Sequence, residues 1–139
     1  MISAGNDSGN SSDDNNNDRP SIIVVDDEPD INYLLQEVLE ARGYKVDTFQ
    51  DPSVALDNFS AGKYDLAIVD FKMSPINGFD LYQRFIEIDR DTKVLFLSAD
   101  SQHYANHKRG LPANESRRYI NKPIGIDTLL KQVEDIIKR

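Results

Sequence analysis

The chain has 139 residues, no cysteine and a formal net charge of −8 at pH 7. This length fits one domain, and the absence of cysteine excludes disulfide bonds and thiolate metal sites. The negative charge disfavours nonspecific binding to nucleic acid or to an anionic membrane surface. No apolar run is long enough to span a bilayer, and the first residues lack the features of a signal peptide, so we expect a cytoplasmic protein.

Residues 1–20 differ in composition from the rest of the chain. Asn, Asp, Ser and Gly dominate there, and hardly any apolar residue is present. Such a segment cannot bury enough apolar surface to offset the entropy that ordering would cost. We therefore expect a disordered, acidic and polar leader that at most solubilises the protein. A single domain over residues 21–139 should follow it.

From residue 21 on, strand and helix signals alternate. Short apolar runs predict strands, and apolar residues at helical spacing predict the helices between them. The predicted strands are residues 22–26, 45–50, 66–70, 94–97 and 118–121, and the main helical stripes cover residues 31–39, 52–59, 78–86 and 129–137. This alternation predicts a parallel sheet with helices on both faces. Five strands and five helices would use the whole domain, so we expect no output domain.

Residues 101–117 fit this scheme least. The segment should hold the fourth helix, but it has few apolar residues, and Gly110 and Pro112 interrupt it. We therefore expect a short or irregular fourth helix of one or two turns.

Charged residues stand at the ends of three predicted strands. Asp26 and Asp27 close the first strand, Asp70 closes the third, and Lys122 follows the fifth. The carboxyl ends of parallel strands lie along one edge of a sheet, where ligands bind. Carboxylates at such close range repel each other and therefore favour a divalent cation with oxygen ligands. A carboxylate nucleophile beside a lysine and a cation can receive a phosphoryl group.

Five sequence elements, in this order, resemble the receiver domain of two-component response regulators. They are Val25-Asp26-Asp27-Glu28, Asp70, the loop with Met73 and Gly78, Ser98-Ala99, and Tyr119-Ile120-Asn121-Lys122-Pro123. The resemblance covers residues 21–139. It implies a flavodoxin-like α/β fold, which is a doubly wound, five-stranded parallel sheet in the order 2-1-3-4-5.

The resemblance also implies a role for each matching residue. Asp70 matches the acceptor of a phosphoryl group from a histidine kinase or phosphotransfer protein. Asp27 matches a direct ligand of Mg²⁺, Asp26 its neighbour that often acts through water, and the main-chain carbonyl of Lys72 a further ligand. Mn²⁺ could replace Mg²⁺. Lys122 matches the lysine that pairs with the acceptor and then with the phosphoryl group.

Two further positions match the switch residues of the family. Ser98 stands where a hydroxyl follows the phosphoryl oxygen, and Tyr119 matches the aromatic residue that moves with it. Such a protein assists its own phosphorylation and dephosphorylation but is otherwise no enzyme, and it signals to a downstream protein through its surface. The chain departs from the family where proline follows Met73 one residue late. Lys72 and Asp100 occupy variable positions that tend to tune the lifetime of the phosphoryl group.

Other functions fit the residues less well. A Mg²⁺-dependent phosphohydrolase with an aspartyl nucleophile commonly has a carboxylate two residues after it, where this chain has Lys72. A constitutive interaction module would not need the acidic pair, the acceptor and the lysine. Nucleotide binding is disfavoured because neither a Gly-x-Gly-x-x-Gly motif nor a phosphate-binding Gly-Lys-Ser/Thr motif occurs.

Overall fold

Five parallel strands form one sheet in the computed structural model, which describes residues 19–99 and 118–138. The strands are β1 (Ser21–Val25), β2 (Lys45–Phe49), β3 (Leu66–Asp70), β4 (Lys93–Ser98) and β5 (Tyr119–Asn121). Their order in the sheet is β2-β1-β3-β4-β5, which confirms the predicted flavodoxin-like topology. Strand bounds differ from the predicted ones by no more than one residue. The first strand ends at Val25, so Asp26 belongs to the connection after it.

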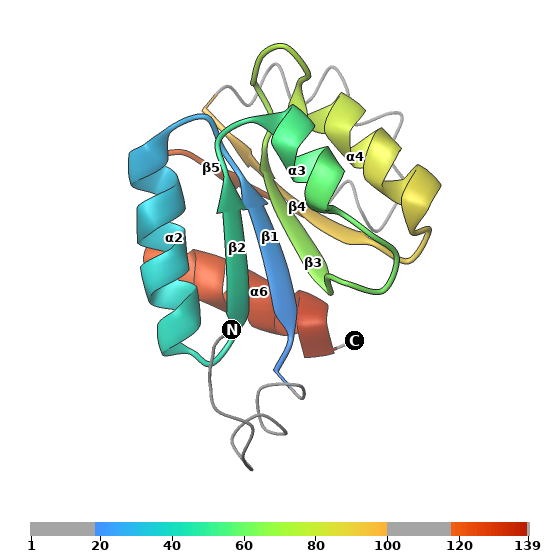
Figure 1. The fold of residues 1–139 in the computed structure, drawn as a ribbon. Coiled ribbons are helices and arrows are strands. Elements are labelled where there is room, and N and C mark those ends of the chain that lie inside the picture. Colours follow the sequence, from blue (N-terminus) through green and yellow to red (C-terminus); the bar gives the residue numbers. More distant parts are fainter. Residues whose placement is uncertain (1–18, 100–117, 139) are drawn as a thin grey trace, which may run out of the picture.

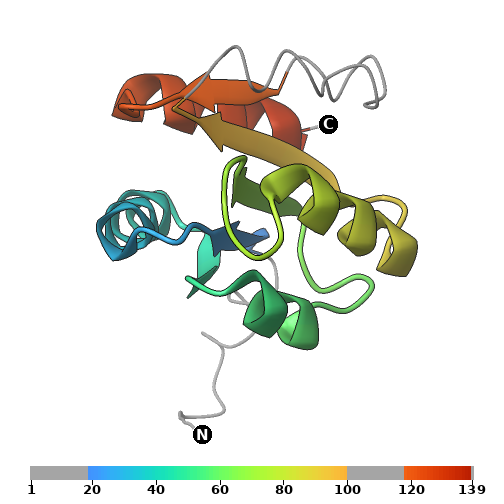
Figure 2. The ribbon, with the colours of Figure 1, turned by 90° about the horizontal axis from the view of Figure 1, so that it is seen from above.

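Helices cover both faces of this sheet, as predicted (Figures 1 and 2). The described residues form α2 (Pro29–Ala41), α3 (Pro52–Asn58), α4 (Gly78–Ile88) and α6 (Ile126–Lys138). Figure 2 shows α2 and α6 on one face and α3 and α4 on the other. The segment 101–117, where we expect a short fourth helix, and most of the expected leader lie outside the described residues. None of the described helices is long and apolar enough to cross a membrane.

Local sequence signals account for several helix ends. The Asp51 carboxylate accepts a hydrogen bond of 2.8 Å from the Ser53 amide and caps α3, whose first residue is proline. The Asn77 side chain accepts one from the Asp80 amide at 2.8 Å and caps α4 in the same way. Gly43 follows the end of α2 with a φ of +94°, which a glycine adopts without strain.

Two separate hydrophobic cores hold the layers together, because successive strand residues point to opposite faces. Side chains on one face pack against α2 and α6, and those on the other pack against α3 and α4. The first set includes Ile22, Val24, Leu66, Ile68, Leu95 and Leu97, and the second includes Ile23, Val25, Ala67, Val69, Val94 and Phe96. The central strand β3 is buried along its whole length. Its last residue, Asp70, is polar and stands at the carboxyl end of the sheet, where the loop to α4 begins.

Candidate functional site

Three carboxylates converge at the carboxyl ends of β1 and β3, at the upper edge of the sheet in Figure 1. One carboxylate oxygen each of Asp26, Asp27 and Asp70 lies within 4.8 Å of the others. Asp26 is completely buried and Asp70 is 5% exposed, whereas Asp27 is exposed. The cluster therefore has two members inside the protein and one that faces solvent.

Main-chain hydrogen bonds and one buried amide fix the turn after β1. The Asp26 amide donates to the Phe49 carbonyl at 3.1 Å, and the Asp26 carboxylate accepts from the Glu28 amide at 2.8 Å. Asn32, which is 6% exposed, donates from Nδ2 to the carbonyls of Asp26 at 2.9 Å and Phe49 at 3.2 Å. Asn32 thus ties the ends of β1 and β2 to α2.

The loop after β3 is closed by contacts between backbone groups. The Phe71 amide donates to the Leu97 carbonyl at 2.7 Å, and the Gly78 amide donates to the Phe71 carbonyl at 2.9 Å. Gly78 packs so closely on the Asp70 carbonyl that a Cβ atom would overlap it. These contacts hold the backbone of Asp70 between β4 and the start of α4.

Lys122 supplies the positive charge of the site. Its ammonium Nζ lies 2.7 Å from Glu28 Oε1, 2.9 Å from Asp26 Oδ2 and 3.4 Å from Asp70 Oδ1. Its side chain is only 12% exposed. The Lys122 amide donates to the Ser98 carbonyl at 2.8 Å, which ties the end of β5 to the end of β4. The peptide bond to Pro123 is cis.

Burial and an excess of negative charge shift the protonation of these groups. Burial raises the pKa of Asp70 to about 7, the Asp26 charge adds to this rise, and Lys122 opposes it. Burial also raises the pKa of Asp26, although the Glu28 amide and Lys122 counteract it. The pKa of Lys122 lies above its ordinary value, because its contacts with Glu28 and Asp26 outweigh the effect of burial.

The chemistry of the donor set fits a small, hard divalent cation. The clustered ligands are carboxylate oxygens, which Mg²⁺ prefers, and one member is open to solvent and thus to the waters that Mg²⁺ retains. Burial, together with the Asp26 charge, raises the pKa of Asp70, and Lys122 does not offset this rise. A second positive charge would stabilise the ionised cluster.

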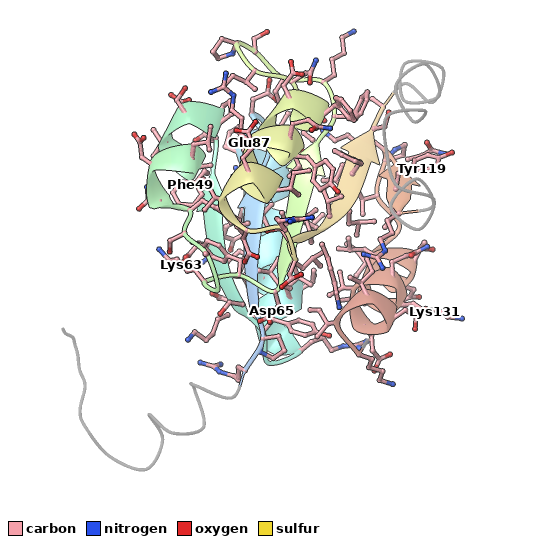
Figure 3. The ribbon with its side chains drawn as sticks, turned by 90° about the vertical axis from the view of Figure 1, so that its right-hand side faces the viewer. Phe49, Lys63, Asp65, Glu87, Tyr119 and Lys131 are labelled. Carbon is pink, nitrogen blue, oxygen red and sulfur yellow. The ribbon has the colours of Figure 1, made fainter. Side chains whose placement is uncertain are left out.

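Other predicted site residues lie at the same edge or next to it. The Lys72 side chain is exposed in the loop after β3, while Ser98 ends β4 and is 2% exposed. Tyr119 begins the edge strand β5 (Figure 3), is half-buried and packs against the α3/α4 core. Asp100 lies outside the described residues.

Two residues of the site have no predicted role in our sequence analysis. Glu28 belongs to the acidic motif, but nothing in an exposed acidic residue points to Lys122 as its partner. The sequence does contain a pattern that indicates a buried role for Asn32. It has helical spacing to the buried Leu35 and Leu39, and a polar residue in such a stripe needs a buried hydrogen-bond partner.

The chain is similar in sequence to bacterial response regulators. The sequence matches the response regulator receiver domain over residues 22–134. It is 34% identical over 119 residues to the nisin biosynthesis regulatory protein NisR of Lactococcus lactis, covering 85% of this chain and 50% of NisR. It is 33% identical over 112 residues to the transcriptional regulatory protein DltR of Streptococcus agalactiae, covering 81% and 49%. The chain thus spans about half the length of these curated relatives.

Two solved structures are similar over almost their whole length. The non-phosphorylated HemR receiver domain of Leptospira biflexa has a TM-score of 0.75 and 27% identity, over 87% of this chain and 96% of that one. The response regulator TrrA of Thermotoga maritima, in complex with Mg²⁺ and beryllium fluoride, has a TM-score of 0.72 and 35% identity, over 84% and 98%. Sequence and fold agree, and the chain belongs to the receiver domain family of two-component response regulators.

Proposed function

We propose that this protein is a phosphorylation-dependent switch that accepts a phosphoryl group on Asp70 from a histidine kinase or phosphotransfer protein. The observation that carries the proposal is the position of Asp70 at the end of the central strand. Its carboxylate is nearly buried, lies beside two other carboxylates and is 3.4 Å from an ammonium group. Membership of the receiver family supports the same reading.

Asp26, Asp27, Asp70 and the main-chain carbonyl of Lys72 would hold Mg²⁺. Bound there, Mg²⁺ would neutralise charge on the phosphoryl oxygens during transfer. The TrrA structure supports this assignment, because beryllium fluoride beside Mg²⁺ stands in for a phosphoryl group. Ionised Asp70 is the nucleophile: one of its carboxylate oxygens bonds to phosphorus, and the bond from phosphorus to the donor breaks.

Lys122 and the two switch residues would respond to the new group. The ammonium is close enough to Asp70 to bind a phosphoryl oxygen after a small movement. Because the Lys122 amide is bonded to the Ser98 carbonyl, that movement occurs beside the end of β4. We propose that the Ser98 hydroxyl then approaches the phosphoryl group and that Tyr119 moves with it. A downstream protein would recognise the changed surface.

Mass spectrometry after incubation with acetyl phosphate and Mg²⁺ tests the acceptor. The wild-type protein should gain the mass of one phosphoryl group, and hydroxylamine, which cleaves acyl phosphates, should remove it. Asp70→Asn should gain none, whereas Asp57→Asn, at an exposed position of α3, should label like the wild type. Undiminished labelling of Asp70→Asn would show that the acceptor is misassigned.

Titration with Mg²⁺, followed by NMR, tests the cation site separately. With few protein ligands, we expect binding of roughly millimolar to sub-millimolar affinity in the wild type. Asp27→Ala should lose most of it while keeping the fold, because this side chain is exposed. Equal binding by wild type and variant would rule out the proposed ligand set.

A further inference from the structure

We infer that Glu28 is a positioning residue, which holds Lys122 back from Asp70 in the resting protein and must release it when Asp70 is phosphorylated. This inference rests on the proposed function. It concerns a residue to which the acidic motif by itself assigns no partner.

The three contacts of the Lys122 ammonium are not equal. The contact to Glu28, at 2.7 Å, is a hydrogen bond, the contact to Asp26, at 2.9 Å, is a close ion pair, and the distance to Asp70, at 3.4 Å, is the longest of the three. In the resting protein the ammonium is therefore engaged mainly by the two residues of the turn after β1. The acceptor receives the weakest share of the positive charge.

Asp26 and Glu28 differ in how readily they can give up the ammonium. Asp26 is completely buried, so its carboxylate would be left without compensating charge. The Glu28 side chain is 60% exposed, and it makes no capping hydrogen bond to α2 although it stands at the N-cap. Water can replace Lys122 around Glu28 at little cost, because exposed ion pairs contribute little free energy.

A phosphoryl group on Asp70 adds oxygens and negative charge next to the ammonium. Phosphoryl oxygens are strong acceptors for the three N–H donors of the ammonium, so the new group competes with Glu28 and Asp26 for its positive charge. Glu28 is the contact that is displaced most easily. The Glu28 carboxylate therefore competes with the phosphoryl group for Lys122 and shifts the equilibrium towards the resting state.

Removing the Glu28 charge should favour the activated state. We expect Glu28→Gln to bind beryllium fluoride, at saturating Mg²⁺, about two- to fivefold more tightly than the wild type, the range of an exposed ion pair. Affinities are measured by NMR titration, with Mg²⁺ affinity determined alone so that each titration is run at saturation. Glu37→Gln, which removes an exposed charge from the same helix, should bind like the wild type.

A double-mutant cycle with Lys122→Gln separates this role from a general charge effect. In the Lys122→Gln background, Glu28→Gln should leave the affinity for beryllium fluoride unchanged. The ε-methylene NMR signal of Lys122 should shift between wild type and Glu28→Gln in the resting protein, and coincide in the two beryllium fluoride complexes. Glu28→Asp, which keeps the charge, should restore at least part of the wild-type affinity.

Two results would overturn the inference. One is an affinity of Glu28→Gln equal to that of the wild type, and the other is an equal gain with and without Lys122. Wild-type protein that labels normally with acetyl phosphate would then show that only the role of Glu28 is wrong. Wild-type protein that neither labels nor binds beryllium fluoride would overturn this inference and the proposed function together.

Discussion

Gly78 and Asp70 are packed backbone against backbone. A Cβ atom at Gly78 would overlap the carbonyl oxygen of Asp70 and come within 2.8 Å of the Phe71 Cα. Both neighbours are main-chain atoms, so no side chain can turn away to make space. The start of α4 and the backbone of Asp70 can therefore pack together only because Gly78 has no side chain.

Gly78→Ala should accordingly destabilise the protein and disturb the acceptor. We expect a loss of about 1–3 kcal/mol in the free energy of unfolding, as is usual when a well-packed site is overfilled. Labelling by acetyl phosphate should slow as well, since the Asp70 backbone must shift. Urea denaturation and a labelling time course measure the two effects. Gly125→Ala is the control, because its Cβ would meet nothing closer than the Thr128 hydroxyl at 3.6 Å.

The raised pKa of Asp70 makes the stability of the cation-free protein depend on pH. Below pH 4 the carboxyl is protonated in both folded and unfolded chains and has no effect. Between pH 4 and about 7 the unfolded chain ionises while the folded one keeps its proton, so stability falls as pH rises. Above about pH 7 the carboxyl is ionised in both states, and its destabilising effect on the folded protein is complete.

Asp70→Asn should therefore stabilise the protein at pH 8 in the presence of EDTA. We expect a gain of up to about 4 kcal/mol over the wild type, which shrinks towards zero near pH 4. Urea denaturation of both proteins at several pH values measures this difference. Mg²⁺ should reduce it by stabilising the wild type alone. A gain that is the same at pH 4 and pH 8 would contradict the assigned ionisation.

Asn32 should be important for stability despite being polar. Asn32→Ala removes hydrogen bonds to the carbonyls of Asp26 and Phe49 and leaves a gap beside the site. We expect a loss of about 1–3 kcal/mol in the free energy of unfolding, because the Asp26 carbonyl loses a buried donor, whereas the Phe49 carbonyl keeps the Asp26 amide. Gln36→Ala is the matched control, since its hydrogen bond to Glu40 is exposed. Comparable losses in the two variants would contradict this role.

Lys122 should contribute to stability as well as to switching. Lys122→Met leaves the buried Asp26 carboxylate without its ion pair, and breaking such a pair typically costs about 3–5 kcal/mol. The loss should be largest at pH 8 and smaller at pH 5, where Asp26 and Asp70 take up protons more readily. Urea denaturation at both pH values is the measurement. Lys131→Met, at an exposed position of α6 (Figure 3), should change stability little.

The predicted parts of the site are those that a strand carries to its end. Asp70 follows an apolar run of strand length, so its place at the sheet edge could be predicted. The position of Lys122 could be predicted in the same way, because it comes directly after the fifth predicted strand. Contacts between side chains on turns could not be predicted, because the rotamer that brings Glu28 to Lys122 leaves no pattern in the sequence. The packing of Gly78 on Asp70 depends equally on the path of a loop that no periodicity describes.

The ion pairs of Lys122 join parts of the chain that are made at very different times. Glu28 and Lys122 are 94 positions apart, and all three clustered carboxylates precede the lysine. While the chain is being synthesised, β1 and β3 can leave the ribosome before β5 exists, and until then the cluster cannot form its ion pairs with Lys122. A chain that stops before β5 would carry Asp70 but not the lysine that pairs with it. The ion pairs that tie the acidic cluster to the end of the sheet therefore form only after β5 has been made.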